Sequence, residues 1–261
     1  MKPVIPQRLF RLFGMCNFKI MTQIFPLSEG TFTVGHDKIF QPFHEDTDVL
    51  NERPTGSLLV EVQPFAVVND KDIILLDTGL GFHHHNGKSM LEKALALHHI
   101  LPSEVTKVLM SHLHKDHAGG LIPGFFPNAL IYIYKPELDY AEKIGMPSYY
   151  TSELQWLKTA SNVQWLDGEE GTIDGYIHFR HSGGHAPYHI VFRIDDESGD
   201  SIFYGGDEAP QWKQMKVKYM AKYDYDGRKA MELRQQWLEE GAAKGWQFLF
   251  YHDIKIPVSR F

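Results

Sequence analysis

The chain has 261 residues, which is enough for one large domain or two small ones, and 43% of them are apolar, which is enough for a sizeable core. Its formal net charge is −7, which argues against a nucleic-acid-binding role that depends on backbone phosphates. No apolar run approaches the length of a membrane span. The single cysteine, Cys16, excludes an intrachain disulfide and a cysteine-based zinc site. It also fits a reducing compartment, so we expect a cytoplasmic protein.

Residues 1–20 lack the periodicity of a packed element. Basic residues interrupt their apolar stretches, so they do not form a secretory signal, although their lack of acidic residues is weakly similar to a transit peptide. We favour Met21 as the natural start. We therefore expect residues 1–20 to be a flexible extension and residues 21–261 to form a single domain.

The first elements read as strands. Residues 21–27 and 31–34 predict two of them, and residues 57–68 and 72–76 predict a pair joined by a turn at 69–71. Residues 36–55 are polar and irregular, and could be a loop over a site or a surface excursion. The strand at 72–76 leads directly into Asp77, Thr78 and Gly79.

Residues 111–120 read Ser-His-Leu-His-Lys-Asp-His-Ala-Gly-Gly and follow a short apolar strand at 107–110. In an extended segment His112 and His114 point to the same side, so both imidazoles can reach one metal ion. Asp116 and His117 follow as the chain turns, so they can diverge toward a second ion. Nitrogen and carboxylate ligands without thiolates suit zinc, or iron or manganese. A polar loop with solvated histidines is the alternative, and the downstream partners described below disfavour it.

Further elements follow in order. A histidine cluster at 83–85 is either a substrate contact or, as we favour, a solvated loop. A capping-box pattern, Ser152 with Gln155, precedes a short helix that ends near residue 160. Tyr149, Tyr150 and Trp156 near it could floor an apolar cleft or pack in the core. The other predicted helices are 90–99, 136–145 and 228–244, the last with Gly245 as its C-cap, and the other predicted strands are 129–134, 176–180, 188–194, 201–204 and 246–251.

The H-x-H-x-D-H run resembles the signature of the metallo-β-lactamase superfamily. Four further segments resemble family elements in chain order, namely Leu-Leu-Asp-Thr-Gly at 75–79, Ser-Gly-Gly-His-Ala-Pro-Tyr-His at 182–189, Tyr-Gly-Gly-Asp at 204–207 and Phe-Tyr-His-Asp at 250–253. The resemblance implies an α/β (α+β) fold, a four-layer αββα sandwich with two face-to-face sheets and helices outside. The loops at one edge would build the site.

The resemblance also implies a dinuclear centre. It puts His112, His114 and His185 on one metal and Asp116, His117 and His252 on the other, with Asp207 bridging the two ions. The expected cofactor is two zinc ions, with iron, manganese or cobalt as alternatives. Asp77 and His189 would support the ligands from behind.

The implied reaction is hydrolysis by a metal-bridging hydroxide that attacks an ester-type carbonyl, with Asp116 and Asp207 as the catalytic carboxylates and Asp116 carrying a proton to the leaving group. Length and motifs resemble the N-acyl-homoserine lactonase branch, which commonly carries a tyrosine three residues after the bridging aspartate. Pro210 stands there in this chain. We therefore predict that Tyr219 and Tyr223 contact the substrate, with Tyr225 as a further candidate.

Two alternatives remain open at this stage. The same site could hydrolyse phosphotriesters or aryl esters, or the chain could be a non-catalytic binding protein on the same fold. The expected partner is a small ester or lactone, with no nucleic acid and no membrane, and a homodimer is left open.

Overall fold

The computed structural model describes residues 21–81 and 89–261. The predicted extension at 1–20 and the histidine cluster at 83–85 lie outside these residues. Within the described ranges, no helix is both long enough and apolar enough to cross a bilayer.

The first large sheet has the strand order β1-β5-β6-β7-β8-β9. Its first three strands pair antiparallel and its last four pair parallel, so β6 to β9 all end at one edge. Its strands are β1 (Gln23–Pro26), β5 (Phe65–Val68), β6 (Ile73–Leu76), β7 (Lys107–Leu109), β8 (Leu130–Tyr134) and β9 (Val163–Leu166).

The second large sheet has its six strands in sequence order from β10 to β15. All neighbours are antiparallel except the parallel pair β13 and β14, which the chain joins through the long helix α6 (Gly227–Lys244). Its strands are β10 (Glu170–Ile173), β11 (Ile177–His181), β12 (Ile190–Asp195), β13 (Ser201–Tyr204), β14 (Gln247–Leu249) and β15 (Val258–Ser259).

A third, small sheet consists of β3 (Phe40–Pro42), β2 (Gly30–Val34) and β4 (Leu58–Val62). The prediction of one strand over residues 57–68 is therefore wrong, because β4 and β5 belong to different sheets and separate at Gln63 and Pro64. Pro64 has no N–H for a ladder, and its carbonyl oxygen accepts the N–H of Leu27 at 2.7 Å. Residues 36–55 are also not wholly irregular, since they contain β3 and a 3-10 helix, η2 (Leu50–Glu52).

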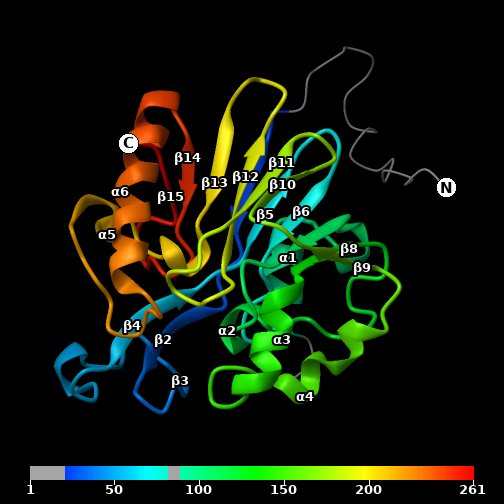
Figure 1. Ribbon diagram of the computed structural model, residues 1–261. Helices are drawn as coiled ribbons and strands as arrows, with labels where there is room; N and C mark the ends of the chain where they lie inside the picture. The colour runs from blue at the N-terminus through cyan, green and yellow to red at the C-terminus, as the bar shows by residue number, and fades with distance from the viewer. Residues whose placement is uncertain (1–20, 82–88) are drawn as a thin grey trace.

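Alternation along the strands creates four layers. In β6, Ile73 and Leu75 pack toward the helices on one side, whereas Ile74 and Leu76 pack toward the second sheet. On the far side of the second sheet, a separate cluster joins Phe203 of β13 to Trp237 of α6. Figure 1 shows α1 (Met90–Leu97) and α3 (Lys135–Ile144) outside one sheet and α6 outside the other. The predicted αββα sandwich is confirmed.

One predicted helix cap is confirmed and another is wrong. Gly245 ends α6 in the left-handed conformation, with φ of 70°, as its C-cap position predicts. The predicted capping box at Ser152 does not form, because α4 begins at Thr151 without a side-chain cap. Gln155 instead donates to Glu142 Oε1 at 2.7 Å and to the Thr151 carbonyl at 3.1 Å. The remaining short helices are α2 (Lys115–Ala118), α4 (Thr151–Leu154), α5 (Trp212–Lys216), η3 (Pro102–Glu104), η4 (Gln155–Lys158) and η5 (Gly206–Glu208).

Candidate metal centre

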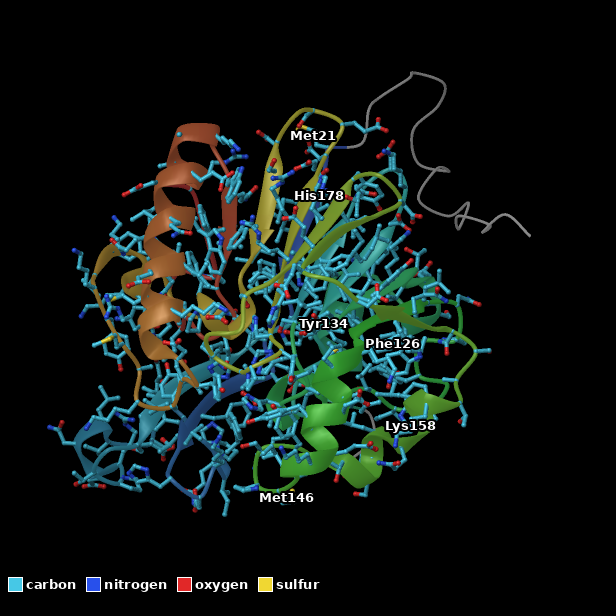
Figure 2. The ribbon with its side chains drawn as sticks, in the orientation of Figure 1. Met21, Phe126, Tyr134, Met146, Lys158 and His178 are labelled. Atoms are coloured by element: carbon cyan, nitrogen blue, oxygen red, sulfur yellow. The ribbon has the colours of Figure 1, made fainter. Side chains whose placement is uncertain are left out.

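The ligand-type side chains predicted from the sequence all lie in turns or short helices that follow strand ends. His112 and His114 come after β7, and Asp116 and His117 lie in α2 directly behind them. The others come from the second sheet: His185 between β11 and β12, Asp207 in η5 after β13, and His252 after β14. In Figure 1 these turns meet beside α2 at the lower end of both sheets. Met146, labelled in Figure 2, marks the outer edge of this end. Ligands of α/β sheets commonly bind at the carboxyl ends of parallel strands.

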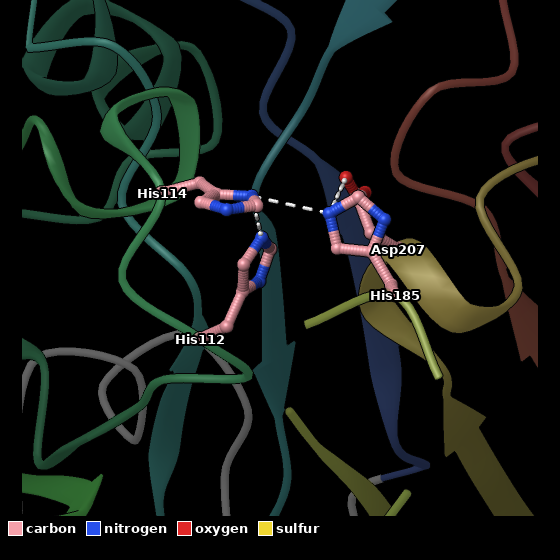
Figure 3. Close-up of side chains that lie close together, drawn as sticks. All are labelled: His112, His114, His185 and Asp207. Atoms are coloured by element: carbon pink, nitrogen blue, oxygen red, sulfur yellow. Dashed lines mark hydrogen bonds and ion pairs between the residues drawn. The ribbon is translucent and has the colours of Figure 1, made fainter. Parts of the chain in front are cut away.

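The first group of donor atoms contains three histidines and an aspartate (Figure 3). His114 Nδ1 lies 2.9 Å from His112 Nε2 and 3.1 Å from His185 Nε2. Asp207 Oδ2 lies 3.3 Å from His185 Nε2. Three ring nitrogens and one carboxylate oxygen therefore point into one small space.

These separations fit a metal ion. Tetrahedral zinc with metal–nitrogen bonds of about 2.0–2.1 Å places its ligand atoms about 3.3 Å apart. The donor set is nitrogen and oxygen, and the side chains of His112, His185 and Asp207 are buried. Buried histidines and aspartates in this arrangement are a binding site for divalent metal.

A second group contains Asp116, His117 and His252. Asp116 Oδ2 lies 3.5 Å from His252 Nε2 and 3.8 Å from His117 Nε2. Both of these nitrogens also lie 3.1 Å from Oδ1 of Asp207. Asp207 thus lies between the two groups, with Oδ1 toward one and Oδ2 toward the other. His117 Nε2 and Asp207 Oδ1 are buried without a hydrogen-bond partner among the described residues, as expected of atoms that ligate a metal.

Of the five candidate histidine ligands, four have a polar contact at Nδ1, the ring nitrogen that faces away from the two groups. This contact fixes the tautomer and turns the free nitrogen toward the site. The pairs are His117 Nδ1 with Asp77 Oδ2 at 2.7 Å, His252 Nδ1 with the Glu61 carbonyl at 2.6 Å, His185 Nδ1 with Asp224 Oδ1 at 3.0 Å, and His112 Nδ1 with Ser111 Oγ at 3.0 Å.

Asp77 is fully buried at the end of β6 and has φ of 57°. Its Oδ1 accepts the Ser111 N–H at 2.7 Å. Its Oδ2 faces the Ser111 hydroxyl at 2.6 Å, His117 Nδ1 at 2.7 Å and the Tyr204 hydroxyl at 2.5 Å. Asp77 also lies close to His112 and His117 as a potential ligand group, but these four contacts occupy its carboxylate. Its geometry is that of a support behind His117.

His189 supports the backbone of Asp207 rather than a histidine ring. Its Nε2 accepts the Asp207 N–H at 3.2 Å, and its Nδ1 lies 3.0 Å from Ser182 Oγ. Gly206, with φ of 49°, lets this turn close, because a Cβ there would be 2.7 Å from His189 Nε2.

Burial and charge act in different directions on the candidate ligands. Burial alone would lower the pKa of His117, His185 and His252, but the charge of Asp207 and of neighbouring carboxylates outweighs it and raises the pKa of all three. Burial lowers the pKa of His112 well below its usual value, and His117 and His114 act in the same direction. Burial alone would raise the pKa of Asp207, but His252, His117 and His185 outweigh it and hold that pKa well below its usual range. Neutral imidazole and ionised carboxylate are the forms that ligate metal ions.

Sequence reasoning did not identify Asp224, Glu208 or Arg234. Glu208 Oε1 accepts the N–H of His185 at 2.9 Å. Arg234, fully buried in α6, donates to the Glu208 carbonyl at 2.8 Å and to the carbonyl of Tyr219. The loop between α5 and α6 is thereby fastened to the turn that carries His185. Asp224 lies 39 residues from His185, so no local motif signals the pairing.

The predicted substrate tyrosines lie on that same loop. The Tyr223 ring is 6.0 Å from the His185 ring. Its side chain is 39% exposed, yet burial, Asp207 and Asp224 raise the pKa of its hydroxyl group. Tyr219 is 41% exposed and Tyr225 is 68% exposed. In the described part of the chain neither makes an aromatic contact with a site histidine, so Tyr223 is the tyrosine of this loop that lies nearest the metal centre.

Tyr149, Tyr150 and Trp156 were predicted either to line a cleft or to pack in the core. Tyr149 is buried against the site. Its ring lies 4.8 Å from that of His114, and its hydroxyl group lies 3.2 Å from Glu137 Oε1. Trp156 is half-buried against the apolar cluster between the first sheet and its helices, and it donates to the Leu121 carbonyl at 3.3 Å. Tyr150 faces Lys115, which lies between two of the candidate ligands.

The αββα architecture and its buried histidine and aspartate cluster define a metal-dependent hydrolase. Residues 59–240 match the model of the metallo-beta-lactamase superfamily, and the chain belongs to that family. No curated protein matches the sequence.

Several solved structures share the fold. A probable metal-dependent hydrolase from Staphylococcus aureus has a TM-score of 0.75 at 20% identity, over 92% of this chain and 92% of that one. AidC, a dizinc quorum-quenching lactonase solved with its product, has a TM-score of 0.67 at 20% identity, over 93% and 92%. The hydrolase AbOPH of the beta lactamase superfamily has a TM-score of 0.69 at 20% identity, over 92% and 89%.

Proposed function

We propose that this protein is a dinuclear metal-dependent lactonase, with N-acyl-homoserine lactones as the first substrates to test. The observation that carries the proposal is the position of Asp207. Its Oδ1 is 3.1 Å from Nε2 of both His117 and His252, and its Oδ2 is 3.3 Å from His185 Nε2. One carboxylate that reaches two sets of histidines is suited to bridge two ions.

In this proposal each ion has three ligands of its own. His112, His114 and His185 would hold one ion, Asp116, His117 and His252 would hold the other, and Asp207 is placed between the two groups. Zinc suits these nitrogen and oxygen ligands, and iron, manganese and cobalt are alternatives. Two bound ions would supply a water of lowered pKa and would polarise an ester carbonyl.

The chain's own residues would position the substrate and protonate its leaving group. The carboxylate of Asp116 lies at the second group and is suited to carry a proton to the leaving alkoxide. The Tyr251 hydroxyl donates to the main-chain carbonyl of Asp116 at 2.6 Å and helps to fix the position of that residue. Pro210 cannot donate to a substrate, and its carbonyl instead accepts the His252 N–H at 3.0 Å. Tyr223, beside His185, takes the role of hydroxyl donor to the substrate carbonyl.

Similar folds support this choice of substrate. Besides AidC, they include an N-acyl homoserine lactone hydrolase, solved with N-hexanoyl-L-homoserine at its catalytic metal centre, at 19% identity and a TM-score of 0.64. The test is a hydrolysis panel on the metal-loaded protein that contains homoserine lactones, simple lactones, aryl esters and phosphotriesters. We expect lactone opening that Asp116→Asn abolishes. Turnover of only phosphotriesters or aryl esters would replace the lactonase assignment with that activity.

A further inference from the structure

We propose that Lys115 and Lys38 form a cationic site beside the metal centre, and that this site selects substrates with a second, anionic group such as a carboxylate on the acyl chain. This inference rests on the proposed function and narrows its substrate class. Its basis is the surroundings of Lys115, which lies in α2 between the candidate ligands His114 and Asp116.

Lys115 is only 6% exposed, which is rare for a lysine without a counter-ion. Residues 21–81 and 89–261 provide no salt bridge to it. Its Nζ lies 5.4 Å from the ring centroid of Tyr150 and 5.8 Å from that of Phe40. These rings come from the start of α4 and from β3, so the ammonium group lies between two aromatic walls. Aromatic faces attract a cation but do not neutralise its charge.

Lys38 brings a second positive charge to the same place. It lies in the turn between β2 and β3, with φ of 57°. Its Nζ donates to Ser148 Oγ at 2.8 Å, and the Ser148 carbonyl accepts the N–H of Lys115 at 2.9 Å. Ser148 therefore joins the two lysine-bearing segments.

The carboxylates near Lys115 do not offset this charge. They are Asp116 and Asp37. Asp116 is a candidate metal ligand, and a bound divalent ion would take up its negative charge. Asp37 accepts the N–H of Ile39 at 3.0 Å and lies in an exposed turn. With metal bound, the two lysines beside His114 would therefore lack a carboxylate partner within residues 21–81 and 89–261.

This arrangement discriminates between substrates. A carboxylate on the acyl chain would provide the counter-ion that Lys115 lacks and would form a charge-assisted hydrogen bond with it. A neutral chain of the same length would cover the lysine without pairing it, which costs free energy. Phe40 and Tyr150 would flank the methylene groups in both cases, so the difference comes from charge.

The test is a binding comparison on the metal-loaded full chain. Adipate and monomethyl adipate have the same carbon backbone and one carboxylate for the metal centre, but only adipate has a second. We expect adipate to bind roughly tenfold more tightly by titration calorimetry, a difference of about 1.4 kcal/mol, because only adipate offers the lysines a charged hydrogen-bond acceptor. The preference should weaken as salt concentration rises.

Variants assign the preference to the lysines. Lys115→Met should remove most of it and Lys115→Arg should keep it. Lys38→Met should reduce it and provides an independent test if substitution at residue 115 disturbs folding. Lys143→Met, at the exposed end of α3, is the matched control and should leave the preference intact. Metal content is measured for every variant.

Equal binding of the two ligands by the wild type would overturn the inference. So would a preference that survives both Lys115→Met and Lys38→Met. The comparison involves no bond cleavage, so an inert lactone panel together with a lysine-dependent preference would refute the proposed function and leave the anion site standing.

Discussion

The imidazole of His185 and the carboxylate of Asp224 face each other across 3.0 Å, from Nδ1 to Oδ1, although 39 residues separate them in the chain. The Asp224 side chain is 1% exposed and lies next to Tyr223. The loop that carries the candidate substrate tyrosine therefore also orients a candidate metal ligand. In the proposed function, this contact links substrate recognition to metal binding.

We predict that Asp224→Ala weakens metal binding by roughly 10–100-fold, because His185 loses the partner that sets its tautomer and ring orientation. Competition with a chromophoric chelator measures this. Asp226→Asn is the control, since residue 226 caps α6 through its side chain and asparagine is an equally good cap. Unchanged affinity in a folded Asp224→Ala protein would show that Asp224 does not position His185.

We predict that Tyr223→Phe slows lactone opening by roughly 10²–10³-fold if its hydroxyl group stabilises the oxygen that becomes charged. Tyr225→Phe is the matched control, because Tyr225 is 68% exposed and should lose little activity. Steady-state kinetics with both variants provide the comparison. If Tyr219→Phe were the slow variant instead, the loop would adopt a different arrangement with substrate bound.

At the opposite end of the sheets, Asp72 ties the layers together. It lies 2.5 Å from Lys107 Nζ and 2.7 Å from Thr106 Oγ1, and the hydroxyl of Tyr176, beside the second sheet, also donates to it. We predict that Asp72→Asn lowers the free energy of unfolding by roughly 1–3 kcal/mol, because among the described residues Lys107 then keeps Asp174 alone as an ion-pair partner, at 3.0 Å. Asp139→Asn, which removes an exposed pair with Lys135, is the control and should change it by less than about 0.5 kcal/mol.

The Asp72 contribution should also depend on pH. Burial alone would raise the pKa of Asp72, but hydrogen bonds from Lys107, Tyr176 and Thr106 outweigh it and lower the pKa below its ordinary value of 3.8. A lowered folded-state pKa gives stability that is present above 3.8 and is lost as the pH falls through the folded-state value. Denaturation of the wild type and Asp72→Asn should therefore converge below that pH, and a constant difference would contradict this.

Metal removal should lower stability as well. A ligand that binds only the folded state stabilises it by RT ln(1 + [L]/Kd), about 2.7 kcal/mol at a concentration of 100 Kd. We predict a clear drop in melting temperature on chelation that is restored by adding back zinc. His252→Ala should show a smaller drop, since it lacks one ligand of the second group. Identical melting with and without chelator would mean that neither group binds metal tightly.

Sequence reasoning identified the cluster because His112, His114, Asp116 and His117 lie within six residues, so their proximity follows from local chain geometry. His185, Asp207 and His252 were reachable only through the resemblance, because the second sheet brings them in from far along the chain. The sandwich was also predictable from the resemblance, and the alternation in β6 explains it physically.

The unpredicted parts depend on tertiary contacts. Pro64 is the only local signal in the sequence for the break between β4 and β5. The break is also held by a distant contact, because the Gln63 side chain donates to the Phe250 carbonyl at 3.0 Å. β15 has only two residues and exists because it pairs with β14. Asp224 resembles an ordinary acidic residue before a helix until the fold places it against His185.

In the proposed metal centre one carboxylate, Asp207, joins two metal-binding groups. Elemental analysis of the wild type and Asp207→Ala, each after reconstitution and removal of loosely bound ions, tests it most directly. We expect close to two ions per wild-type chain, as two three-ligand groups and a bridge require, with loss of at least one in the variant. A reproducible value near one for the reconstituted wild type would contradict the dinuclear centre.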